Sequence, residues 1–349
     1  MSNKSTYSSL LFIVFLLIAI VILFTADIML GSVKIPPGEL WNILIGKGSN
    51  VAWENILFKI RLPKALTAIL AGGALAVCGL QMQTLFRNPL AGPSVLGITA
   101  GASLGVAVVF LGSGLSTSIY ALREIGIQGS WLVFFASTAG SAFVLSLVLL
   151  LSFRVNDNVI LLLVGIMVGN ITLSLVSIWQ YYSHPDQIQD YVLWTMGSLN
   201  GVDSNALKVL FLMVSLALIL SIAISKMLNI LLLGENYARS LGLNIRYVRI
   251  IIILASSILT GSVTGFCGPI GFVGIAVPHL ARVILKTSDH RWLTPASFLT
   301  GAVILLFCDI IAQMPGTAAT LPINAITALI GSPVVIWVIM KRGNLKSSF

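Results

Sequence analysis

Residues 8–30, SSLLFIVFLLIAIVILFTADIML, are the first of ten similar apolar stretches, and they decide the fold class. A helix of about 20 apolar residues crosses the hydrocarbon core of a bilayer, and only helices or closed barrels satisfy their backbone polar groups there. The apolar residues follow one another without a break, whereas a barrel strand alternates apolar and polar positions. This stretch therefore predicts a membrane-spanning helix.

The whole chain has a composition that fits this prediction. Of its 349 residues, 57% are hydrophobic and 9% are charged, whereas about 25% are charged in a typical soluble domain. We predict an all-α polytopic membrane protein, a single transmembrane domain over residues 1–349 with ten transmembrane helices. The expected spans are 8–30, 61–84, 93–112, 129–152, 158–181, 204–225, 248–267, 272–286, 294–313 and 322–341.

The distribution of basic residues predicts the orientation. Ten crossings place both termini on one side, and if that side is the cytoplasm, 13 of the 20 Lys and Arg residues lie inside and 7 outside. This agrees with the positive-inside rule. The formal charge of +9 is then an asymmetry between the two faces of the membrane, and it gives no argument for nucleic acid binding.

One alternative concerns the first span. Lys4 followed by Leu10–Phe24 imitates the basic and apolar regions of a cleaved signal peptide. The apolar run is long for such a peptide, and no clear cleavage motif of small residues follows it. Cleavage would also leave nine spans, so we favour a retained first span.

Three connections between spans are long enough to have structure of their own. On the outer side, Glu39–Ile45, Val51–Ile60 and the segment 183–202 have the spacing of short amphipathic helices lying at the membrane interface. On the inner side, residues 226–247 predict two short helices broken at Gly242, a residue suited to a helix C-terminus. A solvated loop is the alternative, but the apolar residues of this inner segment favour a surface that another molecule covers.

No cofactor site, metal site or nucleotide site is predicted. The chain has no GxxxxGK[ST] phosphate-binding loop and no HExxH motif. Its three cysteines form no CxxC pair and are expected to pack as small apolar residues. Residues 101–105 match the GxSxG motif of serine hydrolases around Ser103, but Gly97, Gly101 and Gly105 recur every four residues, as in closely packed membrane helices.

Few ionisable residues are expected within the spans. Asp309 is the clearest, and it either binds a proton or forms structural hydrogen bonds, the reading that we favour. His290 is expected in an inner loop, His279 near the inner face and His184 in an outer loop, without partners at metal-site spacing. Many spans with little internal charge fit a transporter whose energy comes from a separate soluble partner.

The order of several motifs closely resembles the FecCD family, the permease subunits of ABC importers for ferric siderophores, haem and cobalamin. The motifs are RLPK at 61–64, QMQTLFRNPLAGP at 81–93, GFVGIAVPHLAR at 271–282, DHR at 289–291, LPINAIT at 321–327 and IGSP at 330–333. The resemblance implies a ten-helix subunit of the bacterial inner membrane that pairs with itself or a close paralogue. It also implies two ATPase subunits on the inner face and an extracytoplasmic substrate-binding protein outside.

The resemblance assigns expected roles to individual residues. The segment Gly234–Asn244 matches the part of the family that couples to the ATPase, with Gly234, Glu235, Arg239, Leu241 and Gly242 as the expected coupling residues. Arg61 and Lys64 match basic residues that dock the binding protein, and anchoring of a helix start is the alternative for both. The position of the cytoplasmic gate matches Asn156, Asn158 and Val159. Two positions depart from relatives, Gln313 in place of a basic residue and Asn324 in place of glycine.

The leading hypothesis is therefore a permease subunit without a catalytic site, importing a metal chelate by alternating access. A ferric siderophore is the first expected cargo, with haem, cobalamin or molybdate as alternatives. Two other classes stay open. An ion-coupled secondary transporter would lose its uptake with an ionophore while ATP is present, and an intramembrane hydrolase would depend on Ser103.

Overall fold

The computed structural model describes residues 2–341 except 32, 34, 47, 49, 113–128, 153–157 and 315–319, and all regular structure in this part is helical. Seven helices are long and apolar enough to cross a membrane, and three shorter apolar helices accompany them, Ile98–Leu111, Val273–Leu285 and Ile323–Trp337. Each of these helices coincides with one of the predicted spans, so the predicted fold class is confirmed.

The helices follow one another with short connections. Their bounds are α1 Ser2–Met29, α2 Pro37–Leu44, α3 Val51–Asn55, η1 Ile56–Arg61, α4 Leu62–Leu85, η2 Pro93–Leu96, α5 Ile98–Leu111, α7 Gly129–Ser152, α8 Asn158–Tyr181, α9 Pro185–Thr195, α10 Ser204–Ala223, α11 Ser225–Leu232, α12 Glu235–Ser240, α13 Ile245–Cys267, α14 Val273–Leu285, α15 His290–Ala312 and α16 Ile323–Lys341.

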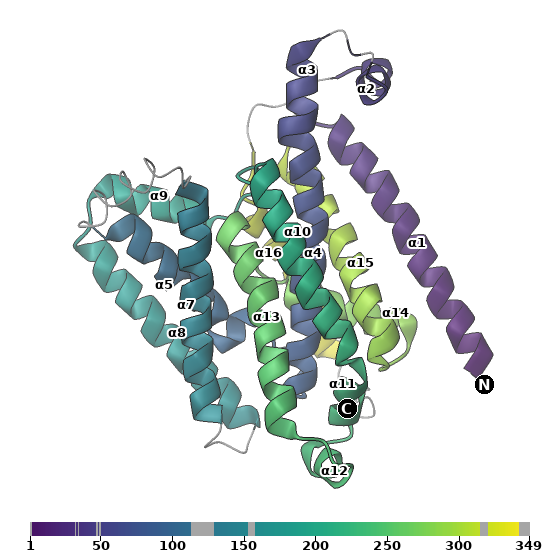
Figure 1. Cartoon of the computed structure of the whole chain (residues 1–349), viewed down its shortest axis with the longest axis vertical. Helices are drawn as coiled ribbons and strands as arrows, with labels where there is room; N and C mark the ends of the chain where they lie inside the picture. Colours follow the sequence, from purple (N-terminus) through teal and green to yellow (C-terminus); the bar gives the residue numbers. More distant parts are fainter. Residues whose placement is uncertain are drawn as a thin grey trace.

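The helices form two groups that meet at α13 and α7. Helices α5, α7, α8 and α9 lie together, while α4 runs through the middle of the other group, against α10, α13, α14 and α15 (Figure 1). Helices α2, α3 and α9 lie at one end of the molecule and α12 at the opposite end, near the start of α1 (Figure 1). We call these the outer end and the inner end.

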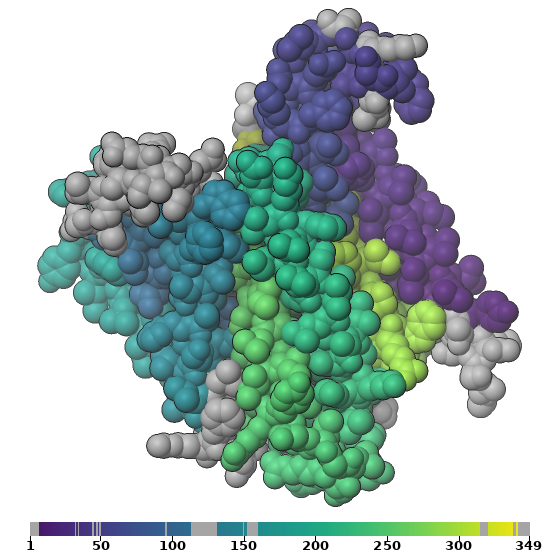
Figure 2. Space-filling model, in the orientation of Figure 1, coloured from purple at the N-terminus to yellow at the C-terminus, as the bar shows by residue number. Residues whose placement is uncertain are grey.

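The segment Val51–Ile60 differs from its prediction. It does not form a separate interfacial helix, because α3, η1 and α4 make one continuous helix, Val51–Leu85, of 35 residues. At about 1.5 Å per residue this helix is roughly 52 Å long, which exceeds the roughly 30 Å hydrocarbon core. It therefore rises above the neighbouring helices at the outer end, where its first turns and α2 form a projection (Figure 2).

A proline explains the irregular turn in this long helix. Pro63 has no N–H, and its ring would clash with the carbonyl four residues earlier in a regular α-helix. The segment Ile56–Arg61 is a π-helix, and the Leu62 N–H bonds to the Leu57 carbonyl, one residue further back than in an α-helix. The wider turn lets the chain pass the proline without ending the helix.

Small residues let the helices approach closely. A Cβ added at Gly79 would lie 1.7 Å from the Gly274 carbonyl oxygen, and one at Gly72 would lie 2.2 Å from that of Gly301. In the other group, a Cβ at Gly105 would lie 1.9 Å from the Ala136 oxygen. This confirms the expected packing role of the glycine repeat in α5, and it adds α4 contacts that the sequence analysis did not identify.

Candidate functional site

The inner end has a protruding segment, Leu233–Gly242, that we call the shoulder (Figure 1). Two short helices do occur, but the predicted break at Gly242 is wrong in position, because α11 and α12 separate at Leu233 and Gly234. Gly234 has φ +106° and Gly242, just after α12, has φ +83°. Glycine adopts such positive angles without the steric cost that other residues incur.

Glu235 anchors the shoulder to the membrane helix that follows it. Its Oε1 accepts from Arg249 Nη2 of α13 at 2.9 Å, and its Oε2 lies 3.9 Å from Arg239 Nη2. The Arg249 side chain is buried, whereas that of Arg239 is 61% exposed. Of the predicted coupling residues, Glu235 is thus engaged within the chain and Arg239 faces outward.

The shoulder exposes large apolar side chains at an end of the molecule where the chain is otherwise polar. Leu233, Tyr237 and Leu241 are 60%, 57% and 56% exposed. They flank a depression lined by residues 233–237, 239 and 240 together with Arg87. Apolar side chains gathered on a surface, with a polar rim, are typical of a protein–protein contact.

Arg61 is buried at the outer end and binds the end of α1. Its Nη1 donates to the carbonyls of Ile28 at 2.7 Å and Met29 at 3.2 Å, and its Nη2 donates to that of Val33. The C-terminal carbonyls of a helix lack partners within the helix and carry partial negative charge, so a cation there is stabilising. This geometry supports the anchoring alternative for Arg61.

Lys64 is buried in a cluster that links α1, α4 and α15. Its Nζ lies 3.1 Å from Asp309 Oδ1, while the Gln313 amide donates to Asp309 Oδ2 at 3.0 Å and to Asp27 Oδ1 at 2.5 Å. Asp27, expected as an outer acid, is therefore a buried residue of α1. Sequence analysis found Asp309 but missed Asp27, because the residues around Asp27 resemble the polar end of a span.

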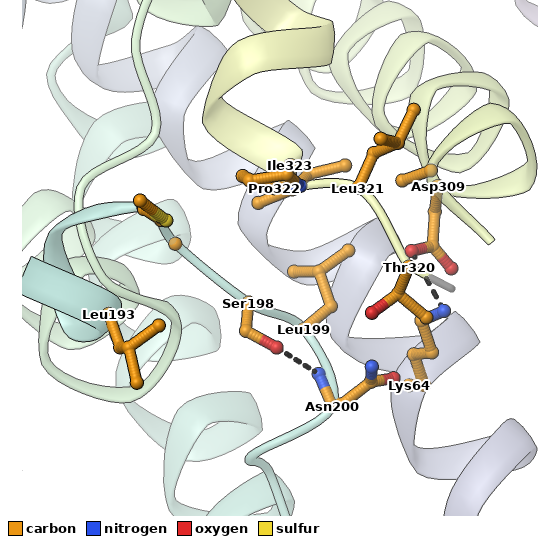
Figure 3. Close-up of a pocket in the computed structure, with 13 residues that line it drawn as sticks. Lys64, Leu193, Ser198, Leu199, Asn200, Asp309, Thr320, Leu321, Pro322 and Ile323 are labelled. Atoms are coloured by element: carbon orange, nitrogen blue, oxygen red, sulfur yellow. Dashed lines mark hydrogen bonds and ion pairs between the residues drawn. The ribbon is translucent and has the colours of Figure 1, made fainter. Parts of the chain in front are cut away.

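A cavity of about 220 Å³ opens beside this cluster. Lys64 and Asp309 point toward each other at its edge, and the segments 196–200 and 320–323 complete its wall (Figure 3). The predicted docking residues are thus part of the wall of an outer cavity. Their charged groups are directed at the interior of the chain.

The remaining predicted residues are placed as follows. Asn158 and Val159 are the first two residues of α8, and Asn156 lies outside the described residues. His290 is not in a loop; it is the first residue of α15 and is fully buried. The prediction failed there because a polar DHR sequence resembles a connection, although Asp289 caps the helix by accepting from the Arg291 N–H at 3.0 Å.

Ser103 lies on α5 and hydrogen-bonds to Tyr191 of α9. Burial raises the pKa of Tyr191, and the bond to Ser103 partly opposes that rise. The hydroxyl of Ser103 therefore joins two helices at the outer end. The partner that this bond gives it is a tyrosine, whereas the hydrolase alternative requires a histidine base.

Comparison with known proteins identifies the family. Residues 16–341 match the model of the FecCD transport family. The hemin transport system permease protein HmuU of Yersinia pestis is 35% identical over 95% of this chain and 96% of its own length. The vitamin B12 import system permease protein BtuC of Klebsiella pneumoniae is 38% identical over 89% of this chain and 88% of its own length.

Solved structures agree with this result. A metal-chelate type ABC transporter in an inward-facing conformation superposes with a TM-score of 0.80 and 28% identity, over 94% of this chain and 98% of the other. PsaBC from Streptococcus pneumoniae, at a TM-score of 0.50 and 12% identity over 85% of this chain and 94% of the other, shares the fold alone. The chain therefore belongs to the FecCD transport family and has the fold of an ABC importer permease.

Proposed function

We propose that this chain is the membrane-spanning subunit of an ATP-driven importer for a large metal chelate, located in the bacterial inner membrane with both termini cytoplasmic. The observation that carries the proposal is the shoulder, a protruding surface with apolar side chains and Arg239 at the inner end of a FecCD permease. A surface of this kind needs a soluble partner, and an ATPase subunit supplies both the contact and the energy.

Three kinds of protein partner follow from this proposal. The ATP-binding cassette subunit binds the shoulder through Leu241, Arg239 and Tyr237. A second permease subunit, either another copy or a close paralogue, completes the transport path, and Asn156, Asn158 and Val159 form the cytoplasmic gate between the two. An extracytoplasmic substrate-binding protein docks at the outer end, where the cavity beside Lys64 opens.

The cargo belongs to the haem, cobalamin and ferric siderophore class. Haem and vitamin B12 appear in the names of the permeases to which this chain is similar over most of its length. Haem is therefore the first cargo to test, ahead of the siderophore expected from the sequence alone.

Uptake into proteoliposomes tests the proposal. The chain is reconstituted with the ATPase and binding protein encoded beside it, and uptake of hemin, cyanocobalamin and a ferric siderophore is measured with ATP. We expect one chelate to accumulate with ATP, and we expect no accumulation with a hydrolysis-deficient ATPase. Accumulation by the purified chain without its ATPase would contradict the proposal.

A second function, ion-coupled transport, is supported by the buried charges Asp27, Lys64 and Asp309, because carriers driven by ions keep such groups within the membrane. Against it, each carboxylate already has a donor within the cluster. A proton ionophore distinguishes the two functions. ATP-driven uptake persists when the ionophore is added with ATP present, whereas ion-coupled uptake collapses.

The gate assignment has its own test. The three native cysteines, Cys78, Cys267 and Cys308, are buried, so a cysteine introduced by Asn158→Cys is available for selective crosslinking. We expect a crosslink between the two permease subunits at this position to stop uptake, and its reduction to restore uptake. Normal uptake in the crosslinked complex would remove Asn158 from the gate.

A further inference from the structure

A buried hydrogen-bond network connects the helix before the shoulder to two membrane helices. Asn229 lies on α11, which packs against α4 and α15. Its Nδ2 donates to Asp289 Oδ1 at 2.7 Å, and its Oδ1 accepts from the His290 backbone N–H at 2.9 Å. These two bonds fix the orientation of the amide, because a carboxylate only accepts and an N–H only donates.

His290 continues the network to α4. Its Nδ1 lies 2.7 Å from Asn229 Oδ1, and since that oxygen is an acceptor, Nδ1 carries the hydrogen. Its Nε2 lies 2.7 Å from Thr84 Oγ1 in the last turn of α4. His290 and Thr84 are both fully buried, and in a low-dielectric interior such bonds are strong and water cannot replace them.

Helices α4 and α15 are held together along their whole length. At the inner end they are joined by Thr84 and His290, and at the outer end by the ion pair of Lys64 and Asp309. Between these points the backbones meet at Gly72 and Gly301, so closely that neither position has room for a Cβ. Close-packed interiors transmit displacement instead of absorbing it, so the two helices move as one unit.

We propose that Asn229 is the joint through which the shoulder moves the α4–α15 pair, with His290 and Thr84 as positioning residues. The inference rests on the proposed function, since it requires an ATPase that displaces the shoulder. The α12 helix begins three residues after α11 ends, so movement of the shoulder reaches Asn229 directly. The far end of the pair carries Lys64 and Asp309 at the outer cavity, so ATP binding at the inner end changes the shape of that cavity.

The experiment compares the amount of cargo imported per ATP hydrolysed in the reconstituted complex. Asn229→Ala and Thr84→Val each break one bond of the joint, and we expect each to lower this ratio at least threefold while the ATPase still co-purifies. The double variant is expected to fall no further than the lower single variant, because residues of one network are not additive. Thr84→Ser keeps the hydroxyl and is expected to restore the ratio.

Thr67→Val is the matched control. Thr67 is also a fully buried threonine of α4, and its hydroxyl donates to the Pro63 carbonyl of the same helix at 2.7 Å. We expect its import ratio to equal that of the wild type at a similar melting temperature in detergent. An equal loss in Thr67→Val, or an additive loss in the double variant, would overturn the joint and indicate general destabilisation.

The wild-type complex separates this inference from the proposed function. If the wild type imports cargo with ATP and the Asn229 and Thr84 variants import with an unchanged ratio, the joint is overturned and the proposed function stands. If the wild type does not import cargo, the proposed function fails and the joint fails with it.

Discussion

At the scale of single residues, the outer end depends on charged groups that replace solvent inside the chain. Arg61 provides donors for carbonyls that end α1, and Asn324 provides an acceptor for the backbone where α13 and α14 separate. The sequence predicted that Arg61 is special but left docking and anchoring open, because partner and backbone carbonyl attract the same guanidinium. Coordinates distinguish them, since they place Ile28 and Met29 within its reach.

Replacing Arg61 with alanine is expected to destabilise the protein. Hydrogen bonds to a charged group contribute about 1.5–3 kcal/mol each, so we expect a loss of at least about 3 kcal/mol and a lower melting temperature in detergent. Lys59→Ala is the control, since Lys59 is an exposed cation of the same turn. Unchanged stability together with slower, salt-dependent association of the binding protein would instead support the docking role.

Replacing Asn324 with glycine, the residue that relatives carry, tests the second group. Asn324 Oδ1 accepts from the Gly271 N–H at 2.9 Å, in the segment that separates α13 from α14. A backbone donor left without a partner costs about 1–3 kcal/mol. We expect Asn324→Gly to lower the melting temperature, whereas Asn170→Gly reports the cost of glycine in an exposed helix. An equal shift in both variants would show that the bond to Gly271 contributes little.

At the scale of helices, the number and type of the spans could be predicted because length and hydropathy are local properties. The long helix Val51–Leu85 and the burial of His290 could not, since both depend on which helices are neighbours. Polar residues at the start of α15 look solvated in sequence, yet Asn229 and Thr84 cover them in the fold. The glycine repeat of α5 was found because it is periodic, whereas Gly79 meets Gly274 far along the chain.

Replacing Gly79 with valine is expected to separate α4 from α14. A Cβ at this position would overlap the Gly274 backbone, and backbone cannot move aside as a flexible side chain can. Overpacking of this kind costs typically 1–3 kcal/mol and sometimes more. Gly38→Val is the control, since a Cβ there meets nothing within 4 Å. Size-exclusion chromatography and thermal unfolding measure the effect, and a monodisperse Gly79→Val variant of normal stability would contradict this packing.

At the scale of the whole molecule, ATP hydrolysis at the inner end must change the outer end, and Gly242 tests the inner contact. We expect Gly242→Val to leave ATP hydrolysis in place while uptake falls, because valine resists φ +83° and the turn after α12 would change direction. Gly46→Val is the matched control, since Gly46 has φ +72° and equally open space but lies at the outer end. Hydrolysis and uptake are measured together in proteoliposomes. The backbone strain is of similar size in both variants, about 1–2 kcal/mol, so a loss of coupling confined to Gly242→Val reports the shoulder. An equal loss in Gly46→Val would assign the effect to strain, and normal coupling in Gly242→Val would show that the shape of this turn does not carry the signal.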